Sequence, residues 1–193
     1  MNLKPDPTVL QFAASLVSRR PEDKGRDFVV AYTVDDHSFQ VFEKAVPNSG
    51  FQGGRFLHRT VCINPETGQP YKASDVYIGA KVNLEGWTFV LQEASEAALR
   101  VMEAHPDIFE RSDLYAITDK IRQKMRGKLE EMKNAFKTLD PRNRGRVSLV
   151  ELQGIFKQFG IQMDDQEFLT LFRRFQYGDS DRFEYHDFVD AIH

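Results

Sequence analysis

The sequence predicts an α+β fold in which a small antiparallel β-barrel or sandwich is followed by an all-α region. Up to about residue 93, apolar and polar residues alternate with the two-residue period of strands. Beyond that point the apolar positions recur every three or four residues, as in amphipathic helices. We therefore expect a β module with a C-terminal helix over 1–106, a helical linker over 107–128, and a helix–loop–helix pair over 129–193.

The β module is expected to contain roughly six strands, because short turns separate its alternating segments. The turns are marked by acidic, asparagine and glycine residues that tolerate tight backbone geometry, at 35–38, 48–54, 64–68 and 85–86. The strands expected between them cover 9–18, 28–34, 39–43, 56–61, 77–84 and 87–91. We also expect Trp87, at the start of the last hairpin strand, to lie in the core.

Two helical segments follow the strands. Ser95 can cap the first, which Pro106 ends. A longer apolar stripe then runs from Leu114 to Leu139 in steps of three or four residues. This stripe predicts one long amphipathic helix, or two helices with a joint near Gly127.

The first loop of the helical pair, residues 140–151, has the spacing of an EF-hand loop. Asp140 takes the first position, Gly145 the turn and Glu151 the last, with Val147 where paired loops form a short β-bridge. The third and fifth positions, where calcium expects oxygen ligands, hold Arg142 and Arg144, and the other polar positions hold Asn143 and Ser148. Since calcium needs six to eight oxygen ligands, we expect no calcium at this loop.

The second loop departs from the same pattern in a different way. Gln176 replaces the first aspartate, and Asp187 at the last position is shorter than the usual glutamate. A register starting at Asp179 would supply Asp179 and Asp181, but it moves the expected bridge residue Phe183 to a ligand position. The sequence therefore predicts an EF-hand pair that keeps its shape through phenylalanine packing, with no metal or other cofactor.

Composition argues against several functional classes. The formal net charge of −3 is not that of a nucleic-acid binder, and no apolar run approaches the roughly 20 residues of a membrane span. The N-terminal stretch has no apolar signal core, and the single cysteine, Cys62, allows no internal disulfide. No motif combines a nucleophile, a base and an oxyanion donor. We expect a soluble intracellular protein that is not an enzyme.

Arg142, Arg144 and Arg146 alternate along the first loop, so several of them should face outward together. Two interpretations remain open: a basic knob that binds an acidic partner surface, or ordinary solvated loop charge.

The β half resembles the DM-ten domain, a module of proteins in motile cilia and flagella. The matching residues are 26–32, 35–36, 41–43, 48–56, 71, 74–80 and 89–91, with Glu96 and Leu99. With its helical tail the chain is similar to the last part of EF-hand-domain-containing ciliary proteins of the EFHC (myoclonin, flagellar ribbon protein) type. Such proteins typically carry three of these modules, so a chain with one is expected to be a fragment or a shorter relative.

The resemblance implies a pleckstrin-homology-like β-barrel capped by a helix over 95–104. It also implies a structural role in the axoneme, in the cytoskeleton of a cilium or flagellum, as a microtubule doublet inner protein that binds tubulin and neighbouring proteins. The EF-hand pair would then grip a helix or an acidic tubulin patch. The alternatives are a calcium-responsive regulatory module and an accessory domain of a nucleotide kinase, which would need a kinase domain.

Overall fold

The computed structural model describes residues 8–193 and has an α+β fold. The N-terminal residues 1–7, on which the expectation about a signal core rests, lie outside the described residues. The chain divides into two compact units, one ending at Glu110 and the other running from Arg111 to His193. Within residues 8–193, no helix combines the length and the apolar character that crossing a membrane requires.

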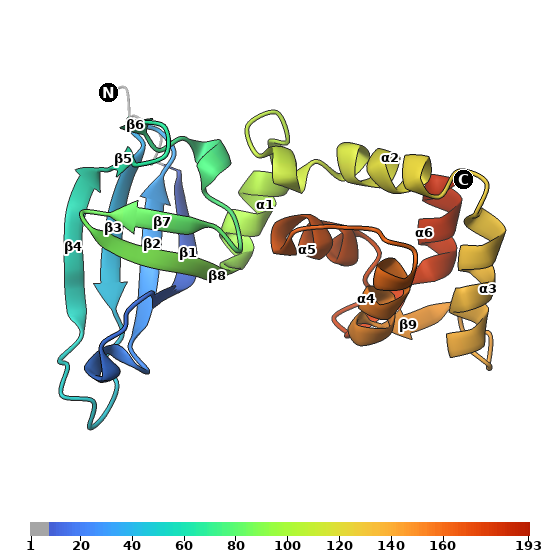
Figure 1. Ribbon diagram of the computed structural model, residues 1–193, viewed down its shortest axis with the longest axis horizontal. Helices are drawn as coiled ribbons and strands as arrows, with labels where there is room; N and C mark the ends of the chain where they lie inside the picture. Colours follow the sequence, from blue (N-terminus) through green and yellow to red (C-terminus); the bar gives the residue numbers. More distant parts are fainter. Residues whose placement is uncertain (1–7) are drawn as a thin grey trace, which may run out of the picture. The chain divides into compact units, whose positions relative to one another are not determined.

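The first unit is built on a six-stranded antiparallel sheet with the strand order β4-β3-β2-β1-β8-β7. Its strands are β1 (Val9–Leu16), β2 (Asp27–Thr33), β3 (Ser38–Glu43), β4 (Gly54–Val61), β7 (Lys81–Leu84) and β8 (Trp87–Ala94). The sheet curls so that β7 and β8 cross in front of β2 and β3 in Figure 1. The edge strands β4 and β7 do not pair with each other, so the sheet is an open half-barrel.

Short elements connect these strands. The two-residue strands β5 (Ile63–Asn64) and β6 (Gln69–Pro70) form a separate hairpin around the turn predicted at 64–68. Short 3-10 helices cover Pro21–Asp23 and Ala73–Asp75, and a third, Glu110–Ser112, spans the boundary between the two units.

Most of the predicted strands are confirmed, with two differences at the last hairpin. The strand expected from residue 77 begins only at Lys81, because Gly79 turns the chain with φ +94°. Trp87 is 39% exposed and not in the core, since it follows the hairpin turn at the open end of β8. Its ring still packs edge-to-face on Phe56, with the centroids 5.3 Å apart.

The core of the first unit lies inside the curl of the sheet. β1 pairs with β2 on one side and with β8 on the other, so the first strand of the unit lies next to the last one. Phe28 anchors the interior, with its ring 5.1 Å from Phe56 and 5.2 Å from Phe89 between centroids. The helix α1 (Glu96–Ala104) follows β8 and is capped as predicted, since Ser95 Oγ accepts a hydrogen bond from the Ala98 N–H.

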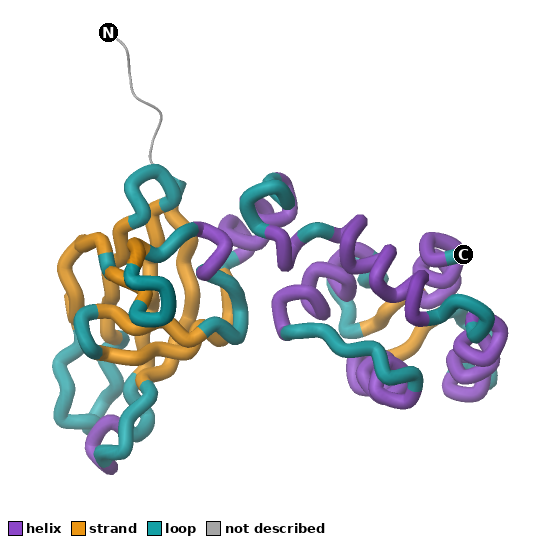
Figure 2. The backbone as a smooth tube through the Cα atoms, turned by 45° about the horizontal axis from the view of Figure 1, so that its top comes forward, coloured by secondary structure: helices purple, strands orange, loops and turns teal. Residues whose placement is uncertain are grey.

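The second unit contains five helices and a short antiparallel ladder among the residues described. The helices are α2 (Leu114–Lys124), α3 (Leu129–Leu139), α4 (Leu149–Gln158), α5 (Asp165–Arg174) and α6 (Tyr185–Ile192). The strands β9 (Arg146–Ser148) and β10 (Arg182–Glu184) lie among these helices, as Figure 2 shows in orange. The long apolar stripe forms two helices, because Gly127 adopts φ +77° between them and interrupts helical geometry.

Helix α2 packs into the core of the second unit. Its buried side chains Ile117 and Ile121, and Met125 directly after the helix, recur every four residues and join the same apolar cluster as the phenylalanines of α5 and α6. Polar contacts hold the same helix: Lys120 pairs with Glu167 at 2.9 Å, and Arg122 donates to the Ala191 carbonyl at 3.0 Å. The range 107–128, predicted as a helical linker, thus contributes α2 to a packed domain.

Candidate functional site: an arginine-lined cleft

The two loops of the second unit meet through the ladder of β9 and β10. Val147 lies opposite Phe183, the pairing that the two loops predict, and both side chains are fully buried. The same register sets Arg146 opposite Glu184 and Arg182 opposite Ser148. The ladder therefore places Arg146 of the first loop beside Glu184 of the second.

Asp140, at the first loop position, is buried, and its carboxylate accepts hydrogen bonds from the protein. Its Oδ2 accepts hydrogen bonds from the Gly145 N–H at 2.7 Å and from the Tyr185 hydroxyl at 3.2 Å. Burial raises the pKa of this carboxyl, but the backbone N–H groups of Arg144 and Gly145 outweigh it and hold the pKa below its ordinary value. The carboxylate therefore connects the start of the loop to Gly145 and to Tyr185.

Glu151, at the last loop position, is committed to capping α4. Its Oε2 accepts from the Ser148 N–H at 2.6 Å and from the Ser148 hydroxyl at 2.8 Å, and the Ser148 Oγ in turn accepts from the Glu151 N–H. The backbone and hydroxyl of Ser148 hold the pKa of Glu151 below its ordinary value. Ser148, noted from the sequence as a loop position, is thus a helix cap.

The second loop is closed by uncharged groups. Gln176 Nε2 donates to the Ser180 carbonyl at 2.6 Å, and the Ser180 hydroxyl donates to the Tyr177 carbonyl at the same distance. The predicted loop positions Asp179, Asp181 and Asp187 are all exposed. Within residues 8–193, no group of three or more His, Cys, Asp or Glu side chains is placed to hold a metal ion.

The donor set of the first loop does not fit calcium. Asp140 and Glu151 are engaged by protein hydrogen-bond donors, and Asn143 bends the chain at φ +48° with its N–H bonded to the Asp140 carbonyl. Arg142 and Arg144 stand where further oxygen ligands would be needed, and each adds positive charge beside the cation.

The first-loop arginines instead line a cavity of about 390 Å³, named here the arginine cleft. Its lining residues are Leu139, Asp140, Pro141, Arg142, Arg144, Arg146, Glu151, Tyr177, Ser180 and Arg182. The structure thus brings the three predicted arginines together and adds Arg182 and Tyr177 from the second loop. Sequence reasoning missed these two, although pairing Val147 with Phe183 already implies the register that brings Arg182 close.

The four arginines of the cleft differ in how they are engaged. Arg146 is fixed, since its Nε pairs with Glu184 at 3.1 Å and its guanidinium carbon lies 3.1 Å from the Tyr177 ring centroid. Arg182 is held more loosely, 4.0 Å from Glu151 and 3.6 Å from Asp181. Among the described residues, the guanidinium groups of Arg142 and Arg144 make no hydrogen bond or ion pair and are exposed.

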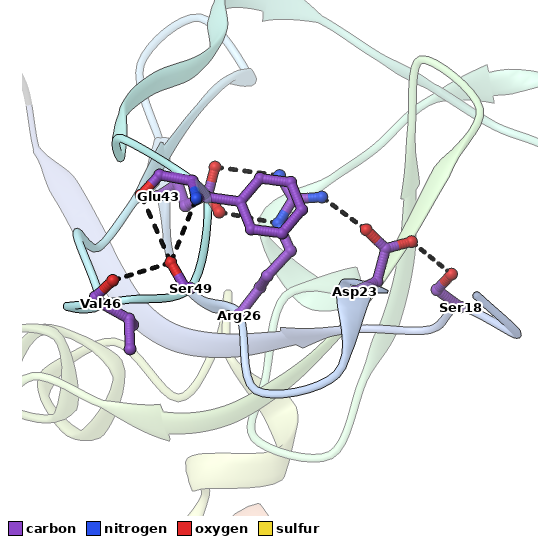
Figure 3. Close-up of polar contacts among 7 residues, drawn as sticks. Ser18, Asp23, Arg26, Glu43, Val46 and Ser49 are labelled. Atoms are coloured by element: carbon purple, nitrogen blue, oxygen red, sulfur yellow. Dashed lines mark hydrogen bonds and ion pairs between the residues drawn. The ribbon is translucent and has the colours of Figure 1, made fainter. Parts of the chain in front are cut away.

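A second arrangement, the arginine clamp, orders the glycine-rich loop of the first unit (Figure 3). Arg26 donates to both carboxylate oxygens of Glu43, at 2.7 and 2.9 Å, and to Asp23 at 2.6 Å. Its guanidinium also stacks on Phe51, 3.9 Å from the ring centroid. The Ser18 hydroxyl and the Arg26 guanidinium hold the pKa of Asp23 below its ordinary value. The clamp ties three segments together and engages three of the five N–H donors of Arg26 with carboxylates of its own unit.

The comparisons with known proteins agree with the resemblance seen in the sequence. The family model described as the DM10 domain matches residues 2–98. The EF-hand domain-containing family member C2 of Bos taurus is 32% identical over 175 residues, which cover 86% of this chain and 24% of that protein. The protein of the same name from Danio rerio is 27% identical over 172 residues, covering 86% of this chain and 23% of the relative.

A second type of relative matches a shorter stretch. The EF-hand domain-containing protein 1 of Mus musculus is 35% identical over 122 residues, which cover 61% of this chain and 19% of that protein. The chain therefore spans about a quarter of the length, or less, of the curated relatives it matches.

Proposed function

The chain belongs to the DM10-domain family and is similar over most of its length to EF-hand domain-containing proteins, and on this premise we propose that it is a structural, non-enzymatic protein of the ciliary or flagellar axoneme. It would bind microtubule doublets and neighbouring proteins, inside the doublet as its family resemblance implies. The first unit serves as the DM10 module, with the curled sheet and α1 in a pleckstrin-homology-like arrangement. The second serves as an EF-hand pair that holds no calcium.

The packing of α2 against α5 and α6 is the observation that favours a structural role over a regulatory one. Calcium sensors of the EF-hand type respond to the ion by opening helix pairs and exposing an apolar groove for a target. Here Ile117, Ile121 and Met125 already cover α5 and α6 and are buried with them. A pair whose apolar surface is filled by its own chain suits a fixed structural module.

Two further observations support binding as the mode of action. The relatives are named after EF-hand domains, and none of these names refers to an enzyme. Arg142, Arg144 and Arg146 gather in one cleft, where their charge suits an acidic patch on tubulin or on an adjacent protein.

Co-sedimentation with stabilised microtubules tests the proposal. The intact chain should pellet with microtubules in a saturable and salt-sensitive manner, because surface arginines meet acidic protein surfaces. A chain that stays in the supernatant at every microtubule concentration would contradict the microtubule-binding role. Calorimetric titration with calcium is the companion measurement, and binding in the micromolar range would replace the structural role with a calcium-responsive one.

A further inference from the structure

The arginine cleft adjoins an apolar groove between α3 and α4. This groove is a second cavity of about 390 Å³, lined by Ala135, Leu139, Gly154 and Ile155 among others. Leu139 and Glu151 line both cavities, so the basic and the apolar parts meet at these two residues. Leu139, which lines both cavities, is 41% exposed, so apolar surface is accessible beside the arginines.

The charged side chains that line the two cavities give a positive sum, because four arginines stand against the two carboxylates of Asp140 and Glu151. Asp140 and Glu151 line the cleft, but their carboxylate oxygens already accept backbone N–H groups. The guanidinium groups of Arg142 and Arg144 make no hydrogen bond or ion pair among the described residues, and each is planar and can hold a carboxylate through two parallel hydrogen bonds. Two guanidinium groups that can bind carboxylates are therefore available next to an apolar groove.

We propose that the cleft and the groove together bind a protein segment that carries acidic residues beside an apolar side chain. The acidic residues pair with Arg142 and Arg144, and the apolar side chain enters the groove between α3 and α4. This inference rests on the proposed function, since it names the chemistry of the partner through which the second unit binds. It does not require that the partner be tubulin.

A segment of this kind fits the site better than a small anion or a nucleic acid. A small anion would leave the apolar groove unfilled, and the unpaired arginines lie on an exposed loop and not around a buried point. A nucleic acid would face the net charge of −3 of the chain. Opposite charge beside apolar surface is the usual composition of a peptide-binding groove.

Fluorescence anisotropy on the full chain provides the test, with three labelled synthetic peptides. The first repeats Glu-Glu-Leu, the second replaces each Glu by Gln, and the third replaces each Leu by Ser. The intact chain should bind the Glu/Leu peptide best, and added salt should weaken this binding because the charges are exposed. Equal binding of the Gln/Leu peptide would overturn the proposal.

Two variants separate the basic part from the apolar part. The double variant Arg142→Ser/Arg144→Ser should weaken binding of the Glu/Leu peptide by about five- to tenfold. The matched control Arg126→Ser/Lys128→Ser removes the same charge at exposed positions outside the cleft and should change the affinity by less than about twofold. Equal loss in both double variants would overturn the site, because bulk charge would then explain the binding.

Gly154→Leu tests the groove. A side chain added at Gly154 meets open space, so the variant should fold and fill the groove from α4. It should weaken binding of the Glu/Leu peptide and leave binding of the Glu/Ser peptide unchanged, whereas no effect on either peptide would overturn the groove as part of the site.

The peptide test and the microtubule test can fail separately. If the chain pellets with microtubules but binds no peptide, the peptide site is overturned and the proposed function stands. If the chain binds the peptide but does not pellet, the peptide site stands and the microtubule-binding role is contradicted.

Discussion

Arg26 shows how one residue can hold the part of the first unit on which the family resemblance depends. Its side chain is 9% exposed and that of Glu43 is 10% exposed, so their pair is shielded from water and from salt screening. The guanidinium also supports Phe51, which belongs to the glycine-rich loop over 48–54. The loop that the sequence marks as irregular is therefore anchored at its centre.

Replacing Arg26 by glutamine should lower the free energy of unfolding of the first unit by about 2–3 kcal/mol, because a nearly buried carboxylate loses its partner. Chemical denaturation followed by Trp87 fluorescence measures the effect, since Trp87 is the single tryptophan of the chain. Arg100→Gln is the control: the Arg100–Glu96 pair on α1 is exposed and should contribute less than about 0.5 kcal/mol. Equal losses in the two variants would show that the clamp contributes no more than a surface pair.

At the scale of elements, backbone conformation and hydrogen bonds hold the first loop of the second unit in shape. Gly145 adopts φ +77° and donates its N–H to Asp140, and its carbonyl accepts from the Tyr185 N–H at 3.0 Å. Glu151 then caps α4 through Ser148. These contacts connect the loop to α4 and α6 on its two sides.

Gly145→Ala should destabilise the second unit by about 1–2 kcal/mol, because alanine is strained at positive φ. The added Cβ would also lie 2.8 Å from His186 Nδ1, so that ring must move. Gly154→Ala is the matched change in the same unit, at a helical position with open space, and should stabilise α4 by roughly 0.5–1 kcal/mol. Thermal unfolding followed by circular dichroism compares the two variants, and opposite signs are the expected result.

At the scale of the whole molecule, the two units have separate cores. The apolar cluster of the second unit contains residues only from Leu114 to Ile192. The first unit closes its own sheet, from β1 to β8, and ends with α1 packed against β1. We therefore expect each unit to fold by itself.

The fragment of residues 111–193 should therefore fold cooperatively when it is produced alone, even with a calcium chelator present. Its first loop is held by Tyr185 and the Gly145 N–H, and α2 supplies the cover for α5 and α6. Circular dichroism and denaturant unfolding in EDTA measure this. An unfolded fragment that gains structure only when calcium is added would contradict both the domain division and the metal-free loop.

The local structure and the residue chemistry of the loops could be predicted from the sequence alone. Alternation and turn residues located most strands, Ser95 marked a helix start, and Arg142 and Arg144 indicated a loop without calcium ligands. These features depend on neighbouring residues, whose period and side-chain chemistry can be read along the chain.

Which segments meet became clear only from the folded chain. It placed β1 between β2 and β8, left the sheet an open half-barrel, exposed Trp87 and packed α2 against α5 and α6. It also brought Arg182 to the arginines of the first loop, and Arg26 to Glu43 and Phe51. The physical reason is that such contacts join residues far apart in the chain, and their energies depend on burial and on packing partners that no local pattern specifies.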